Sequence, residues 1–160
     1  DHSAPLQIVE AVIKVNDEVK RRMIDKIVDI CDGTLRDKTI AVLGVTFKPN
    51  TDDMRDAPSL TIVPALVGAG AKVRVSDPQG QHEGAALLPG VKWIDNPYQA
   101  VAGADLVVLL TEWNEFRGLD LGKLARKMAA PRMADLRNIY DPAEVLEAGF
   151  TAYVGVGRQA

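Results

Sequence analysis

Apolar side chains recur at three- and four-residue steps over the first part of the chain, which is the spacing of one helix face. The pattern runs from Leu6 to Cys31, after Pro5, and ends before Gly33, a residue type that commonly closes helices. Its apolar positions are Val9, Val12, Ile13, Val19, Met23, Ile27 and Ile30. At about 1.5 Å per residue, such a helix is about 40 Å long. The charged run NDEVKRR makes it amphipathic.

From residue 38 onward, short apolar runs alternate with segments of helical character. The predicted strands are 39–45, 71–78, 91–94, 105–112, 132–138 and 151–157, and the predicted helices are 59–70, 96–104, 121–130 and 141–149. Nearly continuous apolar strands between helices are typical of parallel sheets covered on both faces. The pattern therefore predicts an α/β fold: a Rossmann-like, doubly wound, mostly parallel sheet preceded by one long amphipathic helix.

Composition limits the classes of function. The chain has 160 residues, 47% hydrophobic and 26% charged, as expected of one globular domain. A net charge of −3 gives no reason to expect nucleic acid or an anionic membrane as a partner. No apolar run approaches the roughly 20 residues that span a bilayer, and the beginning of the sequence does not resemble a signal peptide. With a single cysteine, the expected compartment is the reducing cytoplasm.

The segment GVTFKPNTDDMRDAPSL, residues 44–60, connects the first predicted strand to the next helix, and we call it the charged crossing. A dinucleotide-binding domain has G-x-G-x-x-G at this point, but this chain has one glycine followed by Lys48, Asp52, Asp53 and Arg55. In a doubly wound sheet, ligands bind outside the carboxyl ends of the strands. Two cations there suit a phosphate or pyrophosphate. The alternative is that these residues are solvated loop charges paired with neighbouring aspartates.

Other polar residues follow the later strands. They are Asp77, then Thr111, Glu112 and Trp113, and finally Arg137. Asp77 stands where a dinucleotide fold holds the adenosine ribose, although an aspartate–proline turn explains SDPQG equally simply. Trp113 either stacks on a ligand ring or packs beneath the rim of the sheet.

Several further residues have structural interpretations. Asp56 is expected to be a helix N-cap, with Pro58 in the first helical turn. Cys31 lies among apolar helix positions and is expected to be a small buried hydrophobe rather than a nucleophile. His2 and His82 lack partners at metal-ligand spacing, and both are expected at the surface.

Four motifs together, GVTFKPNTDDMRDAPSL, VSDP, VVLLTEWNEF and DLRNIYDP, resemble the C-terminal part of the UDP-glucose 6-dehydrogenases, and more broadly the UDP-glucose/GDP-mannose dehydrogenase family. The resemblance covers essentially the whole chain. It implies an enzyme with an NAD-binding N-terminal domain, a central helical dimerisation segment and a C-terminal domain that binds the UDP part of the sugar nucleotide. In that scheme residues 1–34 are the end of the central helix, and residues 35–160 are the UDP-sugar-binding domain.

The resemblance also implies roles for single residues. Lys48 contacts the substrate, Arg137 lies against the UDP moiety, and Arg55 reaches the NAD bound by the other domain. The family oxidises the C6 alcohol of the sugar in two NAD-dependent steps, with a cysteine nucleophile in a G-x-C-F-P-K-D loop. This sequence has neither that loop nor G-x-G-x-x-G. We therefore expect no catalytic residue in this chain and no activity of the chain alone.

Alternatives remain within and outside this family. A UDP-N-acetyl-mannosamine or GDP-mannose dehydrogenase would share the charged crossing, although TEWNEF favours UDP-glucose. A non-catalytic module for nucleotide-sugar binding or dimerisation is the reading from a different class. The long amphipathic helix predicts a homo-oligomer, because one small domain cannot cover its whole apolar stripe.

Overall fold

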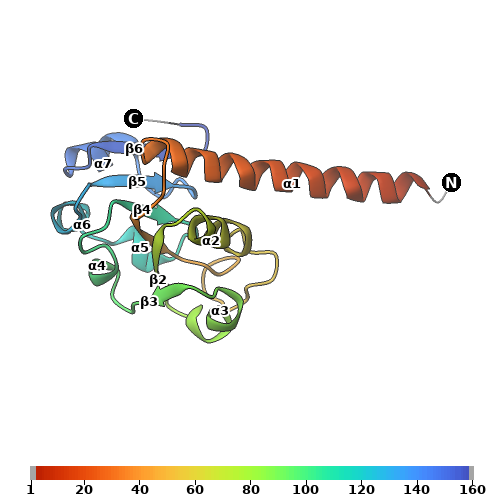
Figure 1. Cartoon of the computed structure of the whole chain (residues 1–160), viewed down its shortest axis with the longest axis horizontal. Coiled ribbons are helices and arrows are strands. Elements are labelled where there is room, and N and C mark those ends of the chain that lie inside the picture. The colour runs from red at the N-terminus through yellow and green to blue at the C-terminus, as the bar shows by residue number, and fades with distance from the viewer. Residues whose placement is uncertain (1–2, 159–160) are drawn as a thin grey trace.

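A six-stranded sheet, parallel at every pairing, lies at the centre of the computed structural model, which describes residues 3–158. Its strands are β1 (Thr39–Leu43), β2 (Lys72–Ser76), β3 (Val91–Trp93), β4 (Leu106–Leu109), β5 (Arg132–Asp135) and β6 (Ala152–Gly155). They lie in the order β3-β2-β1-β4-β5-β6 (Figure 1). The chain moves from β1 to one edge, then crosses back to β4 and moves to the other edge. The carboxyl ends of β1 and β4 therefore form the switch point where open α/β sheets bind ligands.

Helices cover both faces of the sheet, because alternate strand residues point to opposite sides. The helices are α1 (Ser3–Ile30), α2 (Ser59–Gly68), α3 (Gln81–Leu87), α4 (Pro97–Ala100), α5 (Asn114–Arg117), α6 (Leu121–Lys127) and α7 (Pro142–Glu147). Ile40 and Val42 of β1 share a core with α1 and α2. Ala41 and Leu43 share the opposite core with α4 to α7.

The expected fold class is confirmed. The first strand ends where the charged crossing begins, and the short strand predicted at 91–94 is present. Two short helices, α3 and α5, were not predicted. Each is only one or two turns long, which is too short for a helical period to emerge from the sequence.

The expectation for Asp56 is wrong. The helix after the charged crossing begins at Ser59, its N-cap residue is Pro58, and no side chain caps it. Asp56 itself has a left-handed backbone, with φ of 58°, inside a turn in which Ala57 N–H donates to Met54 O at 3.2 Å. The Ser59 hydroxyl instead donates to Val45 O at 2.5 Å and ties the start of α2 to the end of β1.

Helix α1 has two different halves. Its C-terminal part belongs to the core, where Ile27 and Cys31 are fully buried. It closes at Gly33, which has φ of 88° and donates its N–H to Val28 O at 3.0 Å, as predicted. The N-terminal part projects beyond the sheet (Figure 1) and exposes Val15. The side chains of three predicted stripe or boundary residues, Leu6, Val12 and Ile13, lie outside the described side chains.

The packing role expected of Cys31 is confirmed. Burial raises the pKa of its thiol, so it is a poorer nucleophile than a free cysteine. His82 is exposed, as expected, and His2 lies outside the described residues.

Gly44, the first residue after β1, occupies a position that excludes every side chain. Its φ is 87°, and a Cβ placed on it would lie 2.6 Å from the Cβ of Thr111 and 2.9 Å from the Thr111 nitrogen. Such a contact cannot be relieved by rotating a side chain, because the backbone after β4 is part of it. Glycine is therefore required both for the conformation and for the close approach of β1 and β4 at their carboxyl ends.

We predict that Gly44→Ala lowers the free energy of unfolding by about 3 kcal/mol, the sum of a left-handed alanine and an overpacked contact. Gly103→Ala is the matched control, because Gly103 has φ of 71° with open space around its Cβ position. It should cost only about 1 kcal/mol. Urea denaturation of both variants measures the difference, and equal losses would show that the contact with Thr111 costs nothing.

Candidate functional site

The charged crossing starts from a backbone that is fixed on three sides. Gly44 N–H donates to the carbonyl of the last residue of β2 at 2.9 Å. The Thr111 hydroxyl, after β4, donates to Thr46 O at 2.9 Å. The start of α2 holds the third side through the bond from Ser59 to Val45 O. Phe47 and Lys48, the next two residues of the crossing, therefore follow a backbone whose position at the rim of the sheet is fixed.

Asp77 forms the fixed base of this rim. One carboxylate oxygen accepts from Val45 N–H at 2.7 Å and Thr46 N–H at 3.3 Å. The other accepts from Gln79 N–H at 2.9 Å and Gly80 N–H at 2.7 Å. The aspartate–proline turn is thus the correct interpretation of SDPQG. Both oxygens are engaged with backbone, so Asp77 connects the charged crossing to the turn after β2 rather than facing a ribose.

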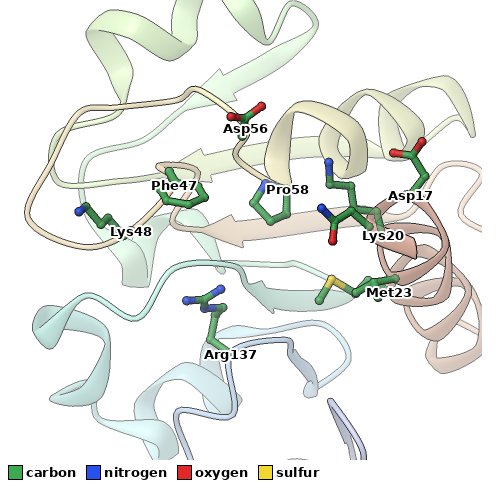
Figure 2. A pocket seen from close by; sticks show the side chains of 10 residues that line it. Asp17, Lys20, Met23, Phe47, Lys48, Asp56, Pro58 and Arg137 are labelled. Carbon is green, nitrogen blue, oxygen red and sulfur yellow. The ribbon is translucent and has the colours of Figure 1, made fainter. Parts of the chain in front are cut away.

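A cavity of about 730 Å³ opens at this carboxyl edge, between the charged crossing, α1 and the loop after β5 (Figure 2). Its size is within the range of small-molecule sites. The lining residues are Asn16, Asp17, Val19, Lys20, Met23, Phe47, Lys48, Asp56, Pro58 and Arg137.

The cavity brings together two of the three predicted site residues. Lys48 from the charged crossing and Arg137 from the loop after β5 both line it, although 89 positions separate them in the sequence. Figure 2 shows Arg137 rising from the β5 side toward the loop with Phe47 and Lys48. Arg55 does not line the cavity. Its side chain is 88% exposed and makes a bidentate pair with Asp53, with bonds of 3.1 and 3.0 Å.

Helix α1 supplies a wall of the cavity that sequence reasoning did not assign. Asn16, Lys20 and Met23 lie at relative positions i, i+4 and i+7, and therefore on one helix face. The signal was available, because Asn16 and Lys20 are polar interruptions on the side of the helix that faces the domain. Phe47, which is 46% exposed at the edge of the cavity, was also missed.

Arg137 is held by the carboxylate of Glu112, which lies in the segment after the neighbouring strand β4. Its Nε donates to one oxygen of Glu112 and its Nη2 to the other, each at 2.9 Å. The side chains are 33% and 29% exposed. These bonds from Arg137, with a smaller contribution from the charge of Arg117, hold the pKa of Glu112 below its ordinary value.

The loop that presents Arg137 folds around the buried carboxylate of Asp135. That carboxylate accepts from Ile139 N–H at 3.0 Å, from Tyr140 N–H at 2.9 Å and from the Tyr153 hydroxyl at 3.1 Å. Burial raises the pKa of Tyr153 to about 12, so its hydroxyl remains a donor at neutral pH. The backbone on both sides of Arg137 is therefore anchored.

Burial decides between the two interpretations of Trp113. Trp113 is 3% exposed and packs in the core shared with α5 and α6, so the interpretation as packing beneath the rim is correct. Among the described residues, no three His, Cys, Asp or Glu side chains are grouped as metal ligands would be. Within the same residues, no helix is both long enough and apolar enough to cross a bilayer.

The strand order and the rim cavity define a Rossmann-like α/β domain with a cavity, bordered by Lys48 and Arg137, at the carboxyl edge of its sheet. The sequence profile described as UDP-glucose/GDP-mannose dehydrogenase family, UDP binding domain, matches residues 41–142. The chain belongs to this family.

Individual relatives agree with this assignment. The chain is 48% identical over 158 residues to a UDP-glucose 6-dehydrogenase of Rhizobium meliloti, a match that covers 99% of this chain and 36% of the relative. A UDP-glucose dehydrogenase from Pyrobaculum islandicum superposes with a TM-score of 0.75 at 28% identity, covering 94% of this chain and 32% of that one. A UDP-D-ManNAc dehydrogenase from Pyrococcus horikoshii gives 0.68 at 27% identity, covering 87% and 30%. The chain thus spans about a third of the length of these relatives.

We predict that the pair of Glu112 and Arg137 stabilises the fold only above mildly acidic pH. A carboxyl whose pKa is lowered by folding contributes stability above its unfolded pKa, and the contribution disappears as the pH falls through the folded value. Both groups are partly exposed, so the contribution is at most about 1 kcal/mol. Urea midpoints between about pH 6 and pH 3 should therefore fall less steeply for Glu112→Gln than for the unaltered chain.

The control for this experiment is Glu115→Gln, a neighbouring exposed glutamate on α5. Over the same pH range, the urea midpoint of Glu115→Gln should fall as steeply as that of the unaltered chain. If the Glu112→Gln and unaltered curves ran parallel, the ion pair would contribute nothing to folding.

Proposed function

We propose that this chain is the nucleotide-sugar-binding part of a UDP-glucose 6-dehydrogenase, which oxidises UDP-glucose to UDP-glucuronate with two NAD. The observation that carries the proposal is the convergence of Lys48 and Arg137 on one cavity at the switch point of the sheet. In this proposal residues 1–34 are the end of a central dimerisation helix, and residues 35–160 form the UDP-sugar-binding domain.

The two cations suit the two phosphates of UDP in different ways. Lys48 is a flexible point charge with three donors, whereas the guanidinium of Arg137 is a planar fork that binds two oxygens at once. Phe47 adds an exposed aromatic face at the edge of the same cavity. In this proposal the cations hold the diphosphate, and the sugar extends from the rim toward the reacting groups.

Arg55 belongs to a different surface. It is almost fully exposed and lies outside the cavity, which is compatible with the proposed contact with NAD on another domain. NAD would supply the acceptor for the hydride in each oxidation step. The oxidation also needs a nucleophile, and Cys31, the single cysteine in these 160 residues, is buried in the core. We therefore propose that this chain binds and orients the substrate but has no catalytic residue. From its single free thiol we also propose that the protein is cytoplasmic.

Two alternatives use the same site. A UDP-N-acetyl-mannosamine or GDP-mannose dehydrogenase would need the same diphosphate contacts, and the similarity to the Pyrococcus horikoshii protein keeps that substrate class open. A non-catalytic nucleotide-sugar module would need nothing beyond the cavity. The relative affinities for UDP-glucose, UDP-N-acetyl-mannosamine and GDP-mannose distinguish the proposed UDP-glucose dehydrogenase from the two other dehydrogenases.

We predict that the chain binds UDP and that Lys48→Ala and Arg137→Ala each weaken binding about ten- to a hundredfold. The reason is the loss of a hydrogen bond to a charged group, worth roughly 1.5 to 3 kcal/mol. Isothermal titration calorimetry with UDP measures the dissociation constants.

Arg55→Ala is the control for this titration, because it removes a cation from the same crossing but outside the cavity. Its affinity for UDP should equal that of the unaltered chain. Equal losses in all three variants would mean that the charged crossing has collapsed or that its charge acts non-specifically. Either outcome contradicts the proposed site.

We also propose that the chain self-associates through α1. Four apolar side chains of this helix are exposed: Ile8 (65%), Val9 (54%), Val15 (54%) and Val19 (38%). Ile8, Val9 and Val15 lie toward the end of α1 that projects away from the sheet (Figure 1), whereas Val19 borders the cavity. Antiparallel pairing of two such helices would cover both stripes with one symmetric contact.

We predict that Val15→Glu converts the proposed dimer to a monomer, because a carboxylate buried in an apolar helix pair has no partner. Sedimentation velocity across a concentration series measures the change. Val156→Glu is the control, since Val156 is similarly exposed (42%) but follows β6. A chain that is monomeric before any substitution would rule out this interface.

A further inference from the structure

The pairing of Glu112 with Arg137 leaves the arginine able to bind a second anion. A guanidinium has five N–H donors in a fixed plane and two edges that can each grip a pair of oxygens. The edge formed by Nε and Nη2 is used by Glu112, with two bonds of 2.9 Å. The hydrogen bonds of Arg137 to the described residues use only this edge. The outer edge, formed by Nη1 and the second hydrogen of Nη2, remains complete.

The backbone under Arg137 is as firmly held as its head group. The Asp135 carboxylate anchors the loop on the side of the sheet. Asn138, the next residue after Arg137, exchanges two hydrogen bonds with the backbone of Val156: its side chain accepts from Val156 N–H at 2.9 Å and donates to Val156 O at 3.0 Å. Because the backbone at Arg137 and its guanidinium are both held by hydrogen bonds, the outer edge of the guanidinium has one orientation at the cavity.

We propose that Glu112 is a positioning residue for nucleotide binding: it holds the guanidinium of Arg137 so that the outer edge faces a phosphate of the bound nucleotide. The inference rests on the proposed function, because it assigns a role at the same cavity. Glu112 does not itself line the cavity, and in this proposal it makes no contact with the phosphate. Its contribution is to remove, before binding, the freedom that a long arginine side chain would otherwise lose on binding.

This role makes a prediction opposite in sign to simple electrostatics. A carboxylate near an anion-binding site repels the anion, so neutralising Glu112 should strengthen binding if its charge alone matters. If Glu112 positions Arg137, neutralising it should weaken binding, because a glutamine offers one acceptor and turns an N–H group toward the second guanidinium donor. The direction of the change therefore separates the two roles.

The test is titration of the whole chain with UDP. Glu112→Gln should weaken binding about three- to tenfold, the range expected when one ordered side chain becomes free. The matched control is Asp32→Asn, which also removes one carboxylate paired with an arginine. That carboxylate is 3.2 Å from Arg132 and is not part of the cavity lining, and φ of 63° at Asp32 suits asparagine. The control should leave UDP affinity unchanged.

Coupling to Arg137 provides a second requirement. In Arg137→Lys the cation remains, but an ammonium group has no second edge to orient. Glu112→Gln should then cost little further affinity in the Arg137→Lys background, so the effects of the two substitutions should be non-additive. Additive losses would count against the positioning role.

A measurement without ligand tests the orientation directly. The Nε–H of Arg137 should give a resolved, slowly exchanging signal in ¹⁵N-edited NMR spectra of the unaltered chain and of Asp32→Asn. In Glu112→Gln the signal should broaden or exchange rapidly with water. A signal that Glu112→Gln leaves unchanged would overturn the positioning role, whatever the nucleotide does.

The outcomes distinguish this inference from the proposed function beneath it. If the unaltered chain does not bind UDP, the proposed function fails and the inference fails with it. If the chain binds UDP, and Glu112→Gln binds equally well or more tightly, only the inference is overturned. Weaker binding in Glu112→Gln, with unchanged binding in Asp32→Asn and loss of the ordered Nε signal, supports it.

Discussion

The close approach of β1 and β4 at their carboxyl ends is the constraint on which the site depends. The backbone at Gly44 lies so near Thr111 that no side chain fits between them. The Thr111 hydroxyl then reaches Thr46 O, and the charged crossing starts from that fixed point. A wider separation would remove this bond and leave the crossing to pair with water. The position of Lys48 on the rim therefore depends on Gly44, four residues earlier, having no side chain.

The cavity is built from parts that are rigid for separate reasons. Asp77 accepts from four backbone N–H groups in two turns, and Asp135 accepts from two backbone N–H groups of the loop that presents Arg137 and from the Tyr153 hydroxyl. Each aspartate is at or just after the end of a strand, where backbone donors have no sheet partner. Carboxylates at strand ends serve structure at these two positions, while the cations on the same rim remain available for a ligand. This division explains how a site without G-x-G-x-x-G can still present a defined geometry.

Much of the fold was predictable, because alternating apolar strands and helices carry a strong signal after residue 38. The placement of Lys48 and Arg137 at one edge was predictable as well, since both follow strands of a parallel sheet, whose carboxyl ends share that edge. Arg55 belongs to the same short motif as Lys48 but lies outside the cavity. Asn50 and Asp56 adopt left-handed backbones that turn the crossing, and their effect on direction cannot be inferred from residue type. The pairing of Arg137 with Glu112 requires that β4 and β5 be neighbours, which only the strand order reveals.

Helix α1 joins three regions in one continuous rod. Near its C-terminal end Ile27 is embedded in the core, Lys20 borders the cavity seven residues earlier, and Ile8 lies near the far end. At about 1.5 Å per residue, Lys20 is about 10 Å and Ile8 about 28 Å from the embedded end. If the rod tilts rigidly about Ile27, a displacement of Ile8 shifts Lys20, in the cavity wall, by roughly a third as much. A partner that held the projecting arm of this helix would therefore also limit the movement of that cavity wall.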